Sequence, residues 1–432
     1  MNKNPQTYHG EWWVPAVLNH DLKETCLNPK GMMGSEAHYE GTLTYHETSG
    51  MSLELYHYSS KFYAKHYGSN DVMWGQDANG HIFTLFNVTM KELRIDDFTC
   101  TIFDVGLILM GEHVLSIEDT RYKSCVVQFS YLRNWAFHNN ITQGNAGTCV
   151  SFKTPYTATK LLEVINDDGA YWRLWQCPSI NKTIHDLTIK QTTEFEIEAT
   201  TELSISSFLK QIEEFAQFLS IALYGDQNPA EVKLTNKETK RESVLLFKKD
   251  ISVDPGVVSL IDFNLLKDKL PQMLNKWHEN YDKIAPISSY LINSLQNKSR
   301  FDVPDFLIIA QALDGYHKRF VNKKDEKDIR KYEEQIEILL NQFKEVKAIK
   351  ECRINPKVLK DTRHKYSHLF PDEEKSLAVE GDDLYWLTEK CKILLTCCIL
   401  DMIGLSNKEI DLCCEYQSPI RQIIDSLPPE FE

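Results

Sequence analysis

The stretch Asn355-Pro-Lys-Val-Leu-Lys-Asp-Thr-Arg-His-Lys-Tyr-Ser-His-Leu-Phe370 decides how the last third of the chain folds. Asparagine followed by proline is typical of a helix start, because asparagine caps free N–H groups and proline fits the first turn. At about 100° per residue, apolar side chains gather on one arc of about 120°. The members of this arc are Val358, Leu359, Thr362, Tyr366, Leu369 and Phe370. The sequence therefore predicts an amphipathic helix over residues 356–369.

The rest of this predicted helix carries one guanidinium and two imidazoles. Arg363 lies at the edge of the apolar arc. Beyond it lie Ser367 and, on the polar side, His364, His368, Asp361 and Lys357. An imidazole with a pKa of about 6.5 exchanges protons at neutral pH, and a guanidinium holds two phosphate oxygens. These groups suit RNA cleavage by the substrate's own 2′-hydroxyl, which needs proton transfer and charge stabilisation but no metal ion.

Two other interpretations of this helix stay open. Arginine and histidine often occur together by chance on a solvated helix. His364 and His368, four residues apart, could also ligate a metal, but further ligands would be needed and no H-E-x-x-H pattern is present. We therefore expect no metal and no cofactor. The pairs Cys397-Cys398 and Cys413-Cys414 lack the spacing of zinc sites and are predicted to be buried core thiols.

The overall composition restricts where nucleic acid could bind. The chain of 432 residues is 42% hydrophobic and has a formal net charge of −14, so as a whole it repels polyanions. The segment from Lys318 to Lys365, however, contains 15 basic and 9 acidic residues, a local excess of 6 positive charges. Lys357, Lys360 and Lys365 are therefore the candidate RNA-binding residues. The acidic N-terminal half is a poor RNA surface, and we expect it to sense a trigger or restrain the C-terminal part.

The N-terminal half contains short runs of β-favouring residues, several of which alternate apolar and polar side chains. These runs lie at 41–45, 51–56, 82–88, 125–131 and 195–199. Thr48-Ser-Gly50 predicts a hairpin turn between two of them. A helix capped by Ser204 or Ser206 is predicted up to residue 224. One or two strands, near 231–234 and 244–247, and a connector at 250–256 are predicted to follow.

From residue 262 onward the helical period dominates. Helices are predicted at 265–297, 303–322, 326–350, 356–369, 382–403 and 406–414, with a break in the first near Pro286. The fold class is α+β: an antiparallel β-sandwich or barrel-like domain over 1–250, followed by an all-α bundle over 262–432. No N-terminal apolar segment and no bilayer-spanning stretch of about 20 apolar residues is present. We expect a cytoplasmic protein with reduced cysteines and no membrane contact.

In this helical context, the pair Arg363 and His368 resembles the signature of the HEPN superfamily of ribonucleases, in which four to six residues separate arginine from histidine. The first intervening residue is usually polar, and His364 fits. The segment Phe306–Phe320 resembles a HEPN helix with an acidic residue at Asp314. The resemblance implies that Arg363, His368 and His364 are catalytic and that Asp314 supports them. It also implies a homodimer, or a higher homo-oligomer, in which two motifs meet at one cleft. On the same helix, we take Asp361 and Ser367 as further supporting residues.

The N-terminal half resembles the N-terminal domain of ApeA-type antiphage proteins. The matching segments are Gly10-Glu-Trp-Trp-Val-Pro15, Gly41-Thr-Leu-Thr44, Leu53-Glu-Leu55 and Val126-Val-Gln-Phe-Ser-Tyr-Leu-Arg-Asn-Trp135. This resemblance implies abortive infection, in which RNA cleavage halts the growth of an infected bacterium, and a phage-derived trigger sensed by the N-terminal domain. Transfer RNA is one candidate substrate, because it is abundant and has single-stranded loops, but no residue pattern identifies it.

Two alternative functions depend on observable features. In a non-catalytic HEPN interaction module, Arg363 and His368 would be buried away from any cleft and would only tie helices together. In a sensor, the β domain would bind a sugar, a nucleotide or a phage protein in an aromatic-lined pocket around Trp12 or Trp13. Neighbouring strand positions face opposite sides, so we expect at least one of these tryptophans in a core and one of them exposed.

Overall fold

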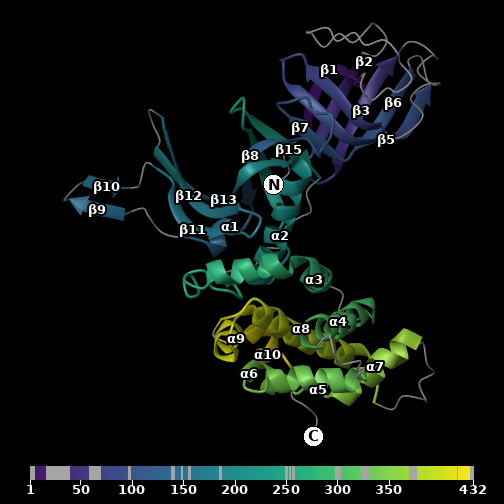
Figure 1. Cartoon of the computed structure of the whole chain (residues 1–432), viewed down its shortest axis with the longest axis vertical. Helices are drawn as coiled ribbons and strands as arrows, with labels where there is room; N and C mark the ends of the chain where they lie inside the picture. Colours follow the sequence, from purple (N-terminus) through teal and green to yellow (C-terminus); the bar gives the residue numbers. More distant parts are fainter. Residues whose placement is uncertain are drawn as a thin grey trace.

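The computed structural model describes most of the chain. The described residues are 5–15, 39–57, 70–95, 99–137, 142–146, 149–153, 157–183, 187–248, 252, 254, 258–296, 303–322, 331–368, 377–415 and 417–428. A β-rich N-terminal region with a barrel and a helical C-terminal region occupy opposite ends of the molecule (Figure 1). The predicted α+β fold class is confirmed.

The first strands close into a barrel, drawn in purple and blue in Figure 1. They are β1 (Gln6–Trp13), β2 (Tyr39–His46), β3 (Gly50–His57), β4 (Asn70–Asp77), β5 (Ile82–Ile95) and β6 (Thr99–Val105). Each pairs with its neighbours in antiparallel fashion, and β5 pairs with both β4 and β6, so the ring has no open edge. The predicted hairpin is confirmed: His46 pairs with Gly50, whose φ of +103° favours glycine.

Both neighbouring tryptophans of β1 are buried. Trp12 lies in the barrel core at 0% exposure and packs on Gly75, where an added Cβ would lie 2.0 Å from the indole ring. Trp13, on the other face, is 4% exposed because His113 covers it, with ring centroids 5.3 Å apart. The expectation that at least one of them packs in a core is confirmed, and neither is exposed. Strand alternation places the two side chains on opposite faces, and both faces are covered.

From β5 the sheet leaves the barrel and continues as a curved layer. In spatial order its strands are β7 (Leu107–Met110), β15 (Glu242–Phe247), β14 (Pro229–Asn236), β8 (Thr120–Phe129), β13 (Leu187–Ser204), β12 (Ala170–Lys182) and β11 (Thr159–Ile165). Strands β9 (Thr142–Ala146) and β10 (Cys149–Lys153) form a separate hairpin. The short helix α1 (Leu132–Trp135) follows β8. Helix α2 (Ile205–Leu223) packs on this layer. The Ser204 hydroxyl accepts a hydrogen bond from the backbone N–H of Ser207 at 3.2 Å, so Ser204 caps this helix as predicted.

The helical region fills the lower half of Figure 1. Its elements are α3 (Leu270–Gln296), α4 (Val303–Tyr316), a π-helix (His317–Val321), α5 (Tyr332–Gln342), α6 (Lys347–Cys352), α7 (Pro356–His368), α8 (Gly381–Met402), α9 (Asn407–Cys414) and α10 (Pro419–Asp425). Cys397, Cys398, Cys413 and Cys414 are all buried, which confirms the prediction of core thiols. Among the described helices, none is long and apolar enough to cross a membrane.

Three details of the helix prediction are wrong. Helix α3 runs through Pro286 without a break. The helix predicted at 326–350 is at least two elements, because α5 ends at Gln342 and α6 begins at Lys347. That turn contains no glycine or proline, and its buried Phe343 and Val346 keep helical spacing, so periodicity did not reveal it. Helix α10, capped by the Ser418 hydroxyl, was not predicted.

Several predicted segments fall outside the described residues. These are the positions of Leu369 and Phe370, the chain from 323 to 330, and most of the connector at 250–256. One hydrophobic core continues from the curved sheet layer through Leu260, Ile261 and Phe263 into the helical region. The division into domains at 1–250 and 262–432 stays a prediction.

Candidate functional site

Helix α7 is held firmly along its apolar side. The Asn355 side chain accepts hydrogen bonds from the backbone N–H groups of Lys357 and Val358 at 3.0 and 3.3 Å, as predicted for its cap. Leu359 and Thr362 are fully buried. The Thr362 hydroxyl also accepts from Val379 N at 3.1 Å, which ties α7 to the segment before α8. The position of α7 is therefore fixed by its packed side, and with it the positions of the residues on its opposite side.

Arg363 lies where three helices meet. Its guanidinium lies 3.8 Å from the Asp314 carboxylate of α4 and 4.5 Å above the Tyr332 ring of α5. The Asp314 carboxylate also accepts from Lys318 Nζ at 2.8 Å. The Arg363 side chain is 31% exposed, so it is oriented by both partners while part of it stays accessible. The structure thus brings together Arg363 and Asp314, a predicted supporting residue.

His364 and His368 are both exposed at the C-terminal end of α7. Their rings pack edge to face, with centroids 4.8 Å apart and an interplanar angle of 89°. Ser367 is also exposed on this turn. The two imidazoles therefore share one accessible surface at the end of the helix that carries Arg363.

Asp361 does not lie on the accessible side. It is 9% exposed, and its carboxylate lies 3.6 Å from Lys360 Nζ. Lys360 in turn pairs with Glu333 of α5 at 2.6 Å. The placement of Asp361 on a solvated polar face is therefore wrong, because α5 packs against α7 and an arc drawn on one isolated helix does not include its neighbour.

The three predicted RNA-binding lysines differ in their surroundings. Lys360 is paired with Glu333, and Lys365, only 11% exposed, is paired with Glu380. Lys357 is exposed and forms no ion pair within the described part of the chain. Of the three, Lys357 has the charge most available to a phosphate.

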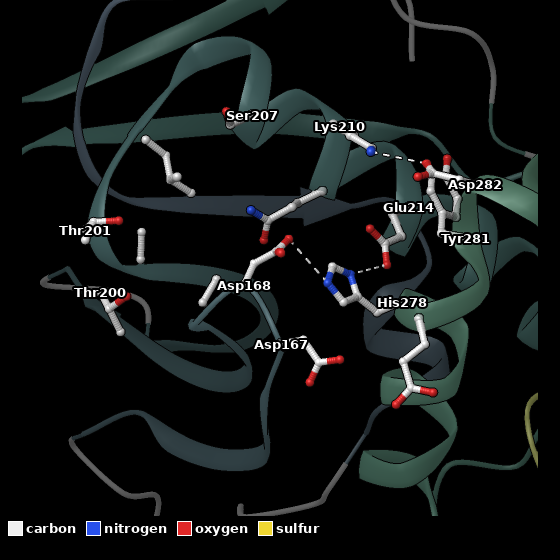
Figure 2. Close-up of a pocket in the computed structure, with 15 residues that line it drawn as sticks. Asp167, Asp168, Thr200, Thr201, Ser207, Lys210, Glu214, His278, Tyr281 and Asp282 are labelled. Carbon is white, nitrogen blue, oxygen red and sulfur yellow. Dashed lines mark hydrogen bonds and ion pairs between the residues drawn. The ribbon is translucent and has the colours of Figure 1, made fainter.

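A second constellation, which the sequence analysis missed, lies beside α2 and α3 (Figure 2). Glu214 is buried, and its Oε1 lies 2.7 Å from His278 Nδ1. The other imidazole nitrogen of His278 faces the Asp168 carboxylate at 3.4 Å. Burial raises the pKa of Glu214 against the opposing effect of His278, and the hydrogen bond that the His278 imidazole donates to Glu214 raises the pKa of His278. These residues are far apart in the chain, so no local pattern predicted their meeting.

Comparison with known protein families matches two segments of the chain. Residues 7–277 match the family model described as ApeA N-terminal domain 1, and residues 307–409 match the model described as Apea-like HEPN. No curated protein and no solved structure matched the chain. The first segment contains the barrel, the curved layer and α2, and the second contains all of α7.

Proposed function

The chain belongs to the ApeA family, in which an ApeA N-terminal domain precedes an ApeA-like HEPN domain, and from this we propose that it is a metal-independent endoribonuclease of antiphage defence. HEPN domains are typically ribonucleases. The observation that carries the proposal is the exposed pair His364 and His368 on the same helix as the oriented Arg363. The enzyme would act in the cytoplasm on RNA, with transfer RNA as one candidate, after its N-terminal domain senses a phage-derived trigger.

The proposed reaction uses the substrate's own nucleophile. His368 removes the proton from the 2′-hydroxyl, the 2′-oxygen bonds to phosphorus, and the bond to the 5′-oxygen breaks. That leaving oxygen takes a proton from a protonated imidazole or from water, and a 2′,3′-cyclic phosphate and a 5′-hydroxyl result. Arg363 holds the oxygens that gain negative charge, and its contacts with Asp314 and Tyr332 orient it beforehand. His364, packed on His368, orients that ring or contacts the same phosphate.

A homodimer fits this mechanism better than a single chain. Arg363 and His368 lie about 140° apart around the helix and about 7.5 Å apart along it. One such pair does not easily surround a phosphate, whereas two copies related by a twofold axis bring the same patch of each chain together. HEPN domains often dimerise, and we propose that two copies of α7 line one composite cleft.

We predict that EDTA leaves cleavage unchanged. The products should end in 2′,3′-cyclic phosphate or 3′-phosphate, because no metal-bound water takes part. Replacing the nucleotide at the cleavage site by its 2′-deoxy form should abolish cleavage, since the nucleophile is then missing. The measurement is mass spectrometry of the products of purified protein. Loss of activity with EDTA, or 3′-hydroxyl ends, would instead support a metal bound by His364 and His368.

We also predict that His368→Ala chains inactivate the wild-type chains with which they form dimers. When His368→Ala chains are mixed in equal amount with wild type and allowed to exchange, activity should fall to about half, because about half of the wild-type chains then lie in mixed dimers that lack the composite site. The control is the same amount of wild-type protein mixed with buffer in place of the variant, so that the concentration of wild-type chains is equal in both samples. Sedimentation in the same samples reports the oligomeric state, and full activity from a monomer would contradict the composite cleft.

The alternative functions are less well supported. A non-catalytic HEPN module would bury both motif residues, whereas His368 is exposed. Trp12 and Trp13 are both buried, with 0% and 4% of their surface exposed, so neither indole offers the accessible surface that the sensor hypothesis expects.

A further inference from the structure

A cavity of about 470 Å³ lies between the curved sheet layer and the helices α2 and α3. We name it the α2–α3 pocket. The turn between β11 and β12 contributes Asp167 and Asp168, and α2 and α3 form the opposite wall. The remaining lining residues lie on β12 and β13: Ala170, Ala199, Thr200, Thr201 and Leu203. Figure 2 shows Asp168, Glu214 and His278 pointing toward one another in it. An occupant would therefore contact both the β-rich region and α3.

The α2–α3 pocket has a negative charge. Its carboxylates are those of Asp167, Asp168, Glu214, Glu279 and Asp282. Only Lys210 and His278 oppose them, and the Lys210 ammonium is already paired with Asp282 at 3.2 Å. Carboxylates remain in excess even when His278 is protonated, so the pocket favours a positively charged occupant.

Two side chains of the wall, Glu214 and Gln211, each have one polar atom without a hydrogen bond to another described residue. Glu214, with 2% of its side chain exposed, uses Oε1 for His278, and its Oε2 has no hydrogen-bond partner among the described residues. Gln211, 7% exposed, accepts from Trp172 Nε1 at 2.8 Å, and its Nε2 has no partner within the same described ranges. Gln211 and Glu214 are three residues apart on α2 and therefore lie on the same face of this helix. A ligand in the pocket that donates to Glu214 Oε2 would form a charge-assisted hydrogen bond with this carboxylate.

We propose that the α2–α3 pocket binds an organic cation through a primary ammonium or guanidinium group that donates to Glu214 Oε2 and to Asp168. Several N–H donors on one charged group match several facing carboxylate oxygens. A bare metal ion fits less well, because no cluster of three or more His, Cys, Asp or Glu side chains among the described residues is arranged to hold one. Free diamines and the side chains of lysine or arginine in a protein present the same group, so the experiment tests both sources.

The experiment is isothermal titration calorimetry of the full-length protein with putrescine, with agmatine, and with end-blocked Gly-Lys-Gly and Gly-Arg-Gly peptides. We expect at least one of these probes to bind, and we expect Glu214→Gln and Asp168→Asn to weaken that binding at least tenfold. Glu213→Gln is the matched control, since Glu213 is an exposed neighbour on α2 outside the pocket wall. The neutral analogue 1,4-butanediol should not bind.

The outcomes separate the two sources and can overturn the proposal. Binding of the free amines alone assigns a small metabolite, and binding of the peptides assigns a protein side chain. No binding of any probe, or equal binding by wild type and Asp168→Asn, would refute the site. Asp168 lies on an exposed turn, so this variant tests the proposal even if Glu214→Gln fails to fold. The readout is binding and does not depend on the proposed ribonuclease activity.

Discussion

His368→Ala is expected to slow RNA cleavage by about 10²–10⁴-fold, the usual contribution of a general acid or base. The side chain is exposed at the end of α7, so its loss removes a proton-transfer group without opening a cavity. The free energy of unfolding should change by less than about 0.5 kcal/mol, which thermal unfolding of the same sample checks. A folded His368→Ala protein that cleaves RNA at the wild-type rate would refute the assigned site.

The neighbouring positions give a graded series in the same assay. Arg363→Ala should cost about 10²–10³-fold, the typical effect of removing one stabilising donor, and Arg363→Lys should not restore the rate because lysine lacks the planar fork. His364→Ala should lose less activity than His368→Ala. If the ranking of the two histidines were reversed, the acid–base role would move to His364.

Lys392→Met is expected to lower the free energy of unfolding by about 3–5 kcal/mol. Lys392 is 4% exposed in the middle of α8. Its Nζ lies 2.8 Å from Glu389, 3.3 Å from Asp305 of α4 and 3.2 Å from the Ser294 carbonyl of α3. Methionine keeps the length of the side chain but leaves two buried carboxylates facing each other without a cation. Urea unfolding followed by circular dichroism measures the effect.

Two comparisons isolate the buried charge. Lys408→Met, at an exposed position of α9, should change the free energy of unfolding by no more than about 0.5 kcal/mol. Adding Asp305→Asn and Glu389→Gln to Lys392→Met should recover part of the loss, because no unpaired charge then remains. Equal destabilisation by the Lys392 and Lys408 variants would show that the network contributes nothing.

Local rules predicted the parts of this protein that depend on residues close together in the chain. The Asn355 cap and the helical spacing of Arg363, His364 and His368 follow from bonds within a few residues, as does the turn at Gly50. The alternating runs predicted an antiparallel β fold in the same way. They did not distinguish a sandwich from a barrel, because closure depends on β5 pairing with β6 as well as with β4.

The sequence by itself determined which residues share α7, and with them the chemistry available at its end. Only the tertiary structure decided which neighbours those residues meet: Asp314 and Tyr332 around Arg363, and α5 beside the buried Asp361. It also brought Glu214 to His278 across 64 residues. The physical reason is that capping and periodicity act over one or two turns, whereas burial and ion pairing depend on elements that approach only when the whole chain packs.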